Sequence, residues 1–334
     1  MSHQHLQVAV CIVSHNSADD LTGCLEAVAR QTHHPLEIVL VDCASTDRSL
    51  EVARQFRPAG IACKVIDLGE NLGFSGGTNR AILESNAPYI LTLNPDAHPT
   101  PEFVSRLVDR AIAPSMYRVG AVTGRLVRFG STSDPPVLDA CGMRLTPTWR
   151  HLDRGSGRTD RGQWSTPERV FGATGAATLF RREALEDVAL KGEIFATEFH
   201  TYREDAELCF RLRERRWEVL YEPTAECRHR RHSVPARRRA MPATINFHSL
   251  KNRYLLRAYH QDPANLLLTF VPTAIRDLLA LGYVLTRERD SLAAYRWLWE
   301  NRRHILNRRA DLRRRRTCSS WQLNRWFFRR RGAL

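Results

Sequence analysis

Four short apolar runs, separated by segments with helical periodicity, constrain the fold of this chain more than any other feature. The runs lie at residues 8–13, 37–42, 63–68 and 89–93. Each has the length and composition of a buried strand. The first segment between them starts with Ser17 and Asp20, which have the spacing of a capping box. Buried strands that alternate with helices are typical of parallel sheets, so we predict an α/β fold with a Rossmann-type, mostly parallel sheet covered by helices on both faces.

Polar residues follow each predicted strand at the point where it ends. They are Ser14, His15 and Asn16 after the first run, Asp42 after the second, residues 71–79 after the third, and Asn94 and Asp96 after the fourth. The carboxyl ends of parallel strands meet at one crevice, where open α/β sheets bind ligands. Asn94-Pro95-Asp96 alone would be an ordinary turn. Its position after a buried strand predicts that Asp96 faces the crevice with the other polar groups.

A glycine-rich segment precedes the helix that we predict at residues 76–85. Its sequence is Asn71-Leu-Gly-Phe-Ser-Gly-Gly-Thr-Asn79. Glycine lets a backbone approach a diphosphate closely, and the amino end of a helix attracts anions. The spacing differs from the G-x-G-x-x-G of dinucleotide-binding proteins, so the segment indicates a phosphate site of another kind.

The order of these motifs resembles that of the family 2 inverting glycosyltransferases of the GT-A fold. The motifs are Val-Ser-His-Asn16, Val-Asp-Cys-Ala-Ser-Thr-Asp47, Asn-Leu-Gly-Phe-Ser-Gly-Gly77 and Leu-Asn-Pro-Asp96. Further segments resemble the rhamnosyltransferase-like branch: Leu138-Asp-Ala-Cys-Gly142, Asp153-Arg-Gly155, Gly172-Ala-Thr-Gly-Ala-Ala177, Arg181-Arg182, residues 202–212, His229 and Lys251-Asn-Arg253. The resemblance covers roughly residues 8–260. Two positions depart from it, because Cys43 and Thr78 stand where the family commonly has Asn.

The resemblance implies a nucleotide-sugar donor and a divalent cation. Mg²⁺ or Mn²⁺ would neutralise the charge that develops on the leaving diphosphate, with Asp96 as the ligand. Asn94 replaces the first carboxylate of a stricter Asp-x-Asp motif, so the diphosphate would supply most of the coordination. The predicted nucleotide-sugar site consists of Ser14, Asn16, Asp42, Asp47, Asn71, Gly73, Phe74, Gly76, Asn94 and Asp96. For Asp47 a role as a helix cap is an equal alternative.

The acceptor hydroxyl needs a base within hydrogen-bonding reach. Asp205 is the residue that the resemblance casts in this role, with Glu204 and Gly175 beside the acceptor. Both acids begin a predicted helix, where a carboxylate could instead complement the helix dipole. The family counterpart of His229 would lie near the diphosphate as a metal ligand. The alternative for His229 is membership of the basic patch at residues 228–232.

The positive charge is concentrated at the end of the chain. Residues 287–334 contain 15 arginines and 4 acidic residues, a net charge of +11 out of +14 for the whole sequence. The same region holds four of the seven tryptophans, Trp297, Trp299, Trp321 and Trp326. Cations mixed with interfacial aromatic residues suit an anionic membrane surface, although basic stretches also bind nucleic acid. We favour the membrane, and expect catalysis on a soluble acceptor to survive loss of this tail if the rest stays folded.

An apolar stretch at residues 265–285 precedes the basic tail. It is long enough to span a bilayer, but Pro272, Arg276 and Asp277 lie in its middle. Charges at the centre of a bilayer cost roughly 2.5 to 3.5 kcal/mol each. We therefore expect a helix that lies in the membrane plane or docks on the catalytic domain.

These observations together predict a metal-dependent, inverting glycosyltransferase. Residues 1–240 would form the catalytic domain and residues 241–334 a helical basic extension. The sugar would be L-rhamnose from dTDP-L-rhamnose or a hexose from a UDP-sugar, and the acceptor a glycan or lipid-linked glycan of cell-wall or polysaccharide biosynthesis. Eight cysteines without a C-x-x-C pair, and no signal peptide, predict a cytoplasmic protein at the inner face of the cell membrane. The alternative is a non-catalytic sugar-nucleotide or nucleic-acid-binding protein that uses the basic tail.

Overall fold

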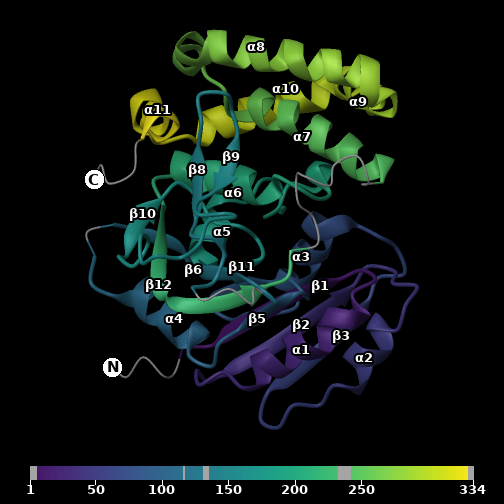
Figure 1. Cartoon of the computed structure of the whole chain (residues 1–334), viewed down its shortest axis with the longest axis vertical. Helices are drawn as coiled ribbons and strands as arrows, with labels where there is room; N and C mark the ends of the chain where they lie inside the picture. The colour runs from purple at the N-terminus through teal and green to yellow at the C-terminus, as the bar shows by residue number, and fades with distance from the viewer. Residues whose placement is uncertain (1–5, 116, 131–134, 232–241, 330–334) are drawn as a thin grey trace.

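The computed structural model describes residues 6–115, 117–130, 135–231 and 242–329. Within these residues, a ten-stranded mixed sheet forms the centre of the molecule (Figure 1). Its main path runs β10 (Glu168–Val170), β12 (Glu218–His229), β6 (Val119–Arg128), β11 (Ala177–Arg181), β4 (Tyr89–Leu93), β1 (Val8–Ser14), β2 (Leu36–Asp42) and β3 (Ala62–Asp67). Short strands β5 (Ala97–Pro99) and β7 (Leu138–Ala140) pair with β12 and β6. Outside this sheet, β8 (Met143–Leu145) and β9 (His151–Asp153) form an antiparallel hairpin.

The four apolar runs of the sequence are the parallel half of this sheet. Strand β1 pairs in parallel with β2 and β4, and β2 pairs in parallel with β3. In the register of β1 and β2, Ser14 lies opposite Asp42, so both strands end at the same edge. The prediction of strands at these four places is confirmed.

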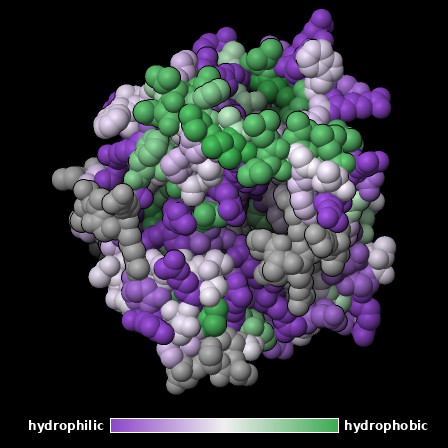
Figure 2. Space-filling view, turned by 45° about the horizontal axis from the view of Figure 1, so that its top comes forward, coloured by the Kyte–Doolittle hydropathy of each residue, from purple (hydrophilic) through white to green (hydrophobic). Residues whose placement is uncertain are grey.

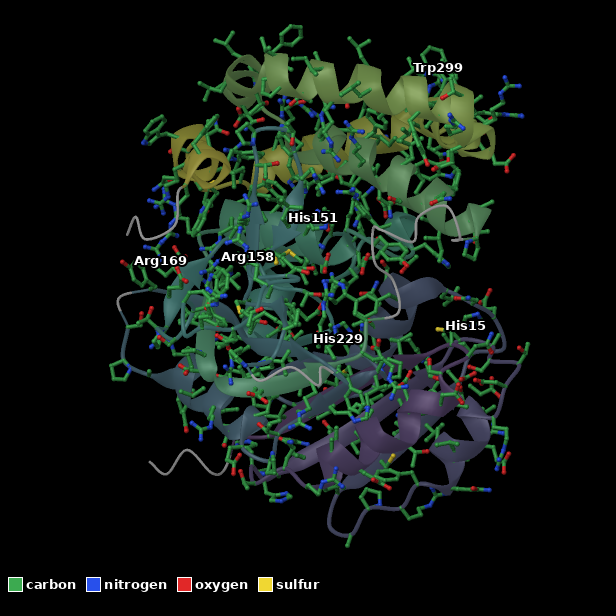
Figure 3. The ribbon with its side chains drawn as sticks, viewed as in Figure 1. His15, His151, Arg158, Arg169, His229 and Trp299 are labelled. Atoms are coloured by element: carbon green, nitrogen blue, oxygen red, sulfur yellow. The ribbon has the colours of Figure 1, made fainter. Side chains whose placement is uncertain are left out.

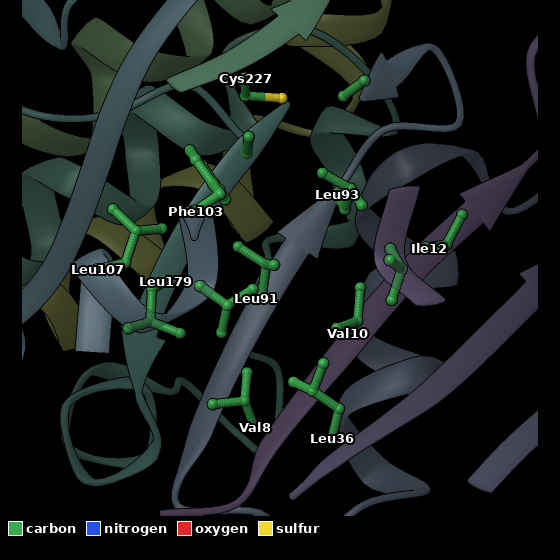
Figure 4. Packing of buried hydrophobic residues seen from close by; sticks show 14 of the residues in the cluster. Val8, Val10, Ile12, Leu36, Leu91, Leu93, Phe103, Leu107, Leu179 and Cys227 are labelled. Atoms are coloured by element: carbon green, nitrogen blue, oxygen red, sulfur yellow. The ribbon is translucent and has the colours of Figure 1, made fainter. Parts of the chain in front are cut away.

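Helices cover both faces of the sheet, as predicted. Alternate residues of β1 point to opposite faces. Val8, Val10 and Ile12 pack in the cluster with α1 (Ala18–Ala29), α2 (Ser49–Gln55) and α4 (Phe103–Ile112), part of which Figure 4 shows. Ala9 and Cys11 pack in the cluster with α3 (Gly73–Leu83), α5 (Arg182–Val188) and α6 (Glu204–Glu214).

The predicted capping box at the start of α1 is wrong. Ser17 is the N-cap residue, but its side chain accepts no capping hydrogen bond. The hydroxyl donates to the carbonyl of His15 instead. Asp20 turns away from the helix end and forms an ion pair with Arg230 (3.0 Å). A contact distant in sequence therefore replaces the local one that the motif predicts.

The C-terminal region is helical and packs on the rest of the chain (Figure 1). Its helices are α7 (Ala243–His260), α8 (Pro263–Arg287), α9 (Ala293–Glu300), α10 (Arg302–Arg315) and α11 (Ser320–Phe328). Two short 3-10 helices, η2 (Thr197–Phe199) and η4 (Arg289–Leu292), lie before α6 and α9. A third apolar cluster joins Phe171 and Phe210 to Ile305, Trp326 and Phe327 of this region. Apolar side chains of the basic tail thus belong to the core.

Candidate active site

A cavity of about 1110 Å³ lies between the ends of the sheet strands and the C-terminal helices. It is lined by residues before α6 and β11, by the β8–β9 hairpin, and by residues of α7 and α8. The predicted site residues Phe74, Asn94, Asp96, Gly175, Glu204, Asp205 and His229 all line it. The proposed metal ligands and the proposed base therefore share one cavity. In the view of Figure 3, His151 lies between His229 and the C-terminal helices.

A buried histidine stands between two carboxylates at one end of this cavity. His229 ends β12, with its Nε2 3.2 Å from Asp96 and its Nδ1 2.8 Å from Asp139. Burial lowers the pKa of His229, but the hydrogen bonds to Asp139 and Asp96 outweigh this effect and raise it to about 9. Asp139 is almost fully buried, and His229 and Arg231 hold the pKa of its carboxyl below the usual value despite burial.

Three residues of this network were not predicted as site residues. Arg231 forms ion pairs with Asp139 and Asp153, which links the histidine to the β8–β9 hairpin. Asp139 and Asp153 occur in two of the motifs that carry the family resemblance. Their positions in the sequence gave no reason to connect them with His229, because the connection is made by the pairing of β12 with β6 and of β6 with β7.

The donor atoms at this end of the cavity suit a divalent cation. The Nε2 atom of His229 is buried, and the nearest described oxygen recorded for it is that of Asp96, 3.2 Å away. Metal-bound histidines commonly hydrogen-bond a carboxylate through the other ring nitrogen, as His229 does with Asp139. Among the described residues, no group of three or more His, Cys, Asp or Glu side chains is arranged to hold a metal. A cation here would therefore need further oxygen ligands from a substrate.

The two acids of the predicted acceptor site begin α6. Asp205 accepts hydrogen bonds from the amides of Gly175 (3.2 Å) and Ala206 (2.7 Å). Burial, and then repulsion from Asp153, raise the pKa of Asp205 to about 6. Burial, and then the charge of Asp205, raise the pKa of Glu204 well above its usual value. A carboxylate that titrates near pH 6 can accept a proton at neutral pH, as a general base must.

The loop before α6 has an unusual backbone conformation. His200, Tyr202 and Arg203 have φ angles of 62°, 66° and 74°. Non-glycine residues in this region are strained and persist where the surroundings hold them. Here the amide nitrogen of Asn252 on α7 lies 2.7–2.8 Å from the carbonyls of Phe199, Thr201 and Tyr202. Asn252 therefore fixes the segment that leads into Glu204 and Asp205.

The residues predicted for the base and ribose lie at the ends of β1 and β2 and do not line this cavity. Asp42 accepts hydrogen bonds from the amide and hydroxyl of Ser45. Asn16 accepts from the amide of Thr46 (2.7 Å). Asp47 accepts hydrogen bonds from the amides of Ala18 and Ser49, so it connects the segment after β1 to the segment after β2. Ser14 is fully buried, and its hydroxyl has no hydrogen-bond partner within the described ranges.

The glycine-rich segment packs closely against protein atoms. A Cβ atom on Gly73 would lie 2.5 Å from the carbonyl oxygen of His200, and one on Gly77 2.6 Å from Val13. The amide of Gly73 donates to the side chain of Asn71, and that of Ser75 to the carbonyl of His200. At Gly76 the added Cβ would meet Leu72. These glycines therefore bring α3 against the sheet and the loop before α6.

Comparison with known proteins agrees with this architecture. The Glycosyl transferase family 2 pattern matches residues 9–189. N-acetylglucosaminyl-diphospho-decaprenol L-rhamnosyltransferase of Mycobacterium tuberculosis is 29% identical over 255 residues, which cover 67% of this chain and 76% of that protein.

Solved structures share the fold at low sequence identity. The mannosyltransferase PcManGT from Pyrobaculum calidifontis, in complex with GDP-Man and Mn²⁺, is 18% identical, with a TM-score of 0.51 over 88% of this chain and 75% of that one. GalNAc-T7 with UDP, GalNAc and Mn²⁺ is 15% identical, with a TM-score of 0.57 over 77% of this chain and 48% of that one. Both have the GT-A architecture that the sequence motifs predict. The chain is thus an enzyme rather than a non-catalytic binding protein: it belongs to glycosyl transferase family 2 and is a glycosyltransferase of the GT-A fold, related to rhamnosyltransferases.

Proposed function

We propose that this glycosyltransferase moves a sugar from a nucleotide-sugar donor to a hydroxyl of a lipid-linked glycan, with inversion at the anomeric carbon. The observation that carries the proposal is that Asp96 and Asp205 line the same cavity. The attacking hydroxyl can then approach the anomeric carbon from the side opposite to the leaving diphosphate. The relative from M. tuberculosis, an N-acetylglucosaminyl-diphospho-decaprenol L-rhamnosyltransferase, favours L-rhamnose as the sugar and a diphospho-polyprenol-linked acceptor. A hexose from a UDP-sugar is the alternative donor.

The donor diphosphate would lie beside Asp96 and His229. We assign these two residues to Mg²⁺ or Mn²⁺, which when bound neutralises the charge of the leaving diphosphate. Asp139 keeps a hydrogen bond on Nδ1 of His229, so Nε2 would be the nitrogen available to a cation. Ser14, Asn16, Asp42 and Asp47 are assigned to the nucleotide base and ribose, and the segment Asn71, Gly73, Phe74 and Gly76, with Asn94, to the rest of the donor.

The acceptor would bind between α6 and Gly175. Asp205 accepts the proton of the attacking hydroxyl, and the amide of Gly175 fixes the orientation of the carboxylate. Burial, and then the charge of Asp205, raise the pKa of Glu204 well above its usual value and so favour its protonated form. Its buried Oε2 has no hydrogen-bond partner among the described residues, so the acid, when protonated, can donate to the acceptor.

The enzyme would meet its lipid-linked acceptor at the cytoplasmic face of a membrane through α8. By length and composition, α8 is apolar enough to cross a bilayer. Its polar side faces the protein, where Thr273 donates to the carbonyl of Pro147, while Leu267, Leu278 and Leu279 on the other side are 81%, 70% and 70% exposed. Figure 2 shows the apolar side chains as a band across one face of the molecule. A surface helix of a soluble protein turns its apolar side to the core and its polar side to water. Because α8 has the reverse orientation, we propose that it lies in the membrane plane.

The test is a screen of donors and acceptors with purified full-length protein. dTDP-L-rhamnose, UDP-hexoses and GDP-mannose are each supplied with Mn²⁺, Mg²⁺ or EDTA, and with a short polyprenyl-diphosphate-linked N-acetylglucosamine as acceptor. We expect cation-dependent transfer from one donor, with a product of inverted anomeric configuration. Transfer that persists unchanged in EDTA, or a retained configuration, would contradict the proposal.

A further inference from the structure

A group of arginines lines the side of the cavity that adjoins α8. Arg150 precedes β9, Arg203 precedes α6, and Arg276 is on α8. Three segments far apart in the sequence thus bring guanidinium groups to the same cavity. The carboxylate next to Arg276 in the sequence, Asp277, forms its ion pairs with Arg253 and Arg257 instead.

Within this group, Arg203 contacts His151 and interacts with the charges of Glu204 and Asp205, so the charge left without an ion pair among the described residues is that of Arg150 and Arg276. Arg150 and Arg276 form no salt bridge to a described carboxylate, and the guanidinium of Arg276 donates only to the carbonyl of Thr148 (2.7 Å). Burial, and then repulsion from Arg253, Arg203 and Arg150, lower the pKa of Arg276 to about 9. Burial, and then repulsion from Arg203, Arg150 and Arg276, also hold the pKa of His151 well below its usual value. Clustered like charges destabilise the folded state unless an anion binds among them.

The arginines are rigidly connected to the outward apolar face of α8. The loop between β8 and β9 is fixed to the inner side of this helix, because Nε1 of Trp149 donates to Asn265 (2.8 Å). Thr273 and Arg276 donate to carbonyls of the same loop. A ligand bound by the arginines would therefore lie between the catalytic carboxylates and the surface proposed to contact the membrane.

We propose that Arg150, Arg203 and Arg276 bind the diphosphate group of a polyprenyl-diphosphate-linked acceptor. This inference rests on the proposed function, and assigns residues to a part of the substrate that the catalytic groups do not touch. Guanidinium groups match phosphate oxygens in a bidentate geometry, and a diphosphate carries enough charge to engage more than one of them. The prenyl chain then leaves the cavity along α8, while the sugar reaches Asp205. The donor diphosphate remains with Asp96 and His229.

The first experiment measures binding of citronellyl diphosphate to the full-length protein by calorimetry, with dTDP and Mn²⁺ present to occupy the donor site. R150Q is the main variant, because the side chain of Arg150 makes no hydrogen bond to a described residue. R276Q is the second variant. R276K keeps the positive charge but lacks the planar guanidinium that can donate two parallel hydrogen bonds. We expect R150Q and R276Q to weaken binding about 10- to 100-fold, the usual effect of a charge-assisted hydrogen bond. The control R303Q removes an equal charge from an exposed position of α10 and should bind like the wild type.

Unchanged binding in both R150Q and R276Q, with unchanged thermal unfolding, would overturn the assignment. Equal affinity for inorganic pyrophosphate would also contradict it, because the site would then bind a free anion. In a third outcome, R150Q but not R303Q loses binding to phosphatidylglycerol vesicles, and citronellyl diphosphate binding does not change. This outcome would overturn the proposal and assign the arginines to lipid headgroups. Failure of the wild type to transfer any sugar would count against the proposed function, whereas unchanged citronellyl diphosphate binding in the variants counts against this site alone.

Discussion

At the scale of residues, two carboxylates of the cavity, Asp96 and Asp205, have different electrostatic surroundings. Asp96 faces the Nε2 atom of His229 and so lies beside positive charge, whereas Asp205 is held by two backbone amides near other acids. The pKa of Asp205 is raised to about 6 chiefly by burial. A base with this pKa is ionised at neutral pH and still basic enough to accept a proton.

The first prediction follows from this pKa. Because the ionised form of Asp205 is the active one, kcat/KM should fall as pH decreases through about 6 and level off above it. Asp205→Asn keeps the shape and removes proton acceptance, so kcat should fall by about two to four orders of magnitude while donor binding barely changes. Steady-state kinetics across pH, with donor affinity from calorimetry, check both. If donor binding were lost and turnover kept, Asp205 would belong to the nucleotide site.

A second prediction concerns the carboxylate behind the histidine. Asp139→Asn removes the charged partner of Nδ1 of His229 but leaves Asp96 and the histidine in place. Outer-shell partners of metal-bound histidines typically contribute about 10- to 100-fold to metal affinity, so the Mn²⁺ concentration needed for half-maximal activity should rise by that factor. Asp19→Asn, an exposed change on α1, is the matched control. An unaltered Mn²⁺ requirement would mean that His229 is not a ligand.

At the scale of elements, α7 positions the loop before α6 from outside the sheet. Its Asn252 is fully buried, and its amide nitrogen lies within hydrogen-bonding distance of the carbonyls of Phe199, Thr201 and Tyr202 before α6. Lys251 adds a hydrogen bond to the carbonyl of Glu198, and Arg253 binds Asp277 of α8. The tripeptide Lys251-Asn-Arg253 thus connects the active-site loop, α7 and α8. The resemblance marked this tripeptide, but its role depends on contacts that only the fold reveals.

The third prediction tests this positioning role. Asn252→Ala should lower kcat more than it changes donor KM, because the strained loop before Asp205 loses the hydrogen bonds that hold it. Loss of buried hydrogen bonds should also reduce the free energy of unfolding by about 1–3 kcal/mol. Asn252→Asp cannot donate to the carbonyls and should not rescue activity. A proportional loss of stability with normal kcat would indicate a purely structural role.

The fourth prediction concerns the outer face of α8. Replacing Leu267, Leu278 and Leu279 together by Gln removes exposed apolar surface without touching the polar side that packs on the protein. Sedimentation with vesicles should show weaker membrane binding, while transfer to a water-soluble acceptor and the thermal unfolding temperature stay unchanged. The residual binding should decrease with salt, since basic residues near an anionic surface are screened. Full vesicle binding by the variant would exclude α8 as the membrane contact.

The sequence predicts the parallel half of the molecule well because each of its strands is specified locally. Strand β4 matches the predicted run of residues 89–93, and α6 begins at Glu204 as predicted. The β8–β9 hairpin and the short strands around it were not predicted, because three-residue strands carry too little periodicity. Composition also cannot tell an arginine that faces a membrane from one that binds backbone carbonyls.

At the scale of the whole molecule, apolar residues and several arginines of the basic tail belong to the folded core, although most of its described arginines are exposed. Arg315 donates to the carbonyls of Asp187 and Ala189, and Arg308 forms an ion pair with Glu193. Of the tail tryptophans, Trp326 is buried whereas Trp299 and Trp321 are exposed. Two of the tail arginines, Arg330 and Arg331, lie outside the described residues. Activity without the tail requires a catalytic domain that folds alone. We therefore do not expect the protein to be active without its tail.

The last prediction is that the enzyme does not fold without its tail. Removing residues 287–334 deletes Ile305, Leu312, Trp326 and other members of the third apolar cluster, and uncovers Phe171 and Phe210. Trp326→Ala and Trp321→Ala provide a graded comparison within α11, because the first side chain is 5% exposed and the second 75%. Trp326→Ala should reduce the free energy of unfolding by about 3–5 kcal/mol, as for other buried aromatic residues. Trp321→Ala should change it little. Cooperative unfolding and normal transfer by the truncated protein would show instead that the catalytic domain is independent of the tail.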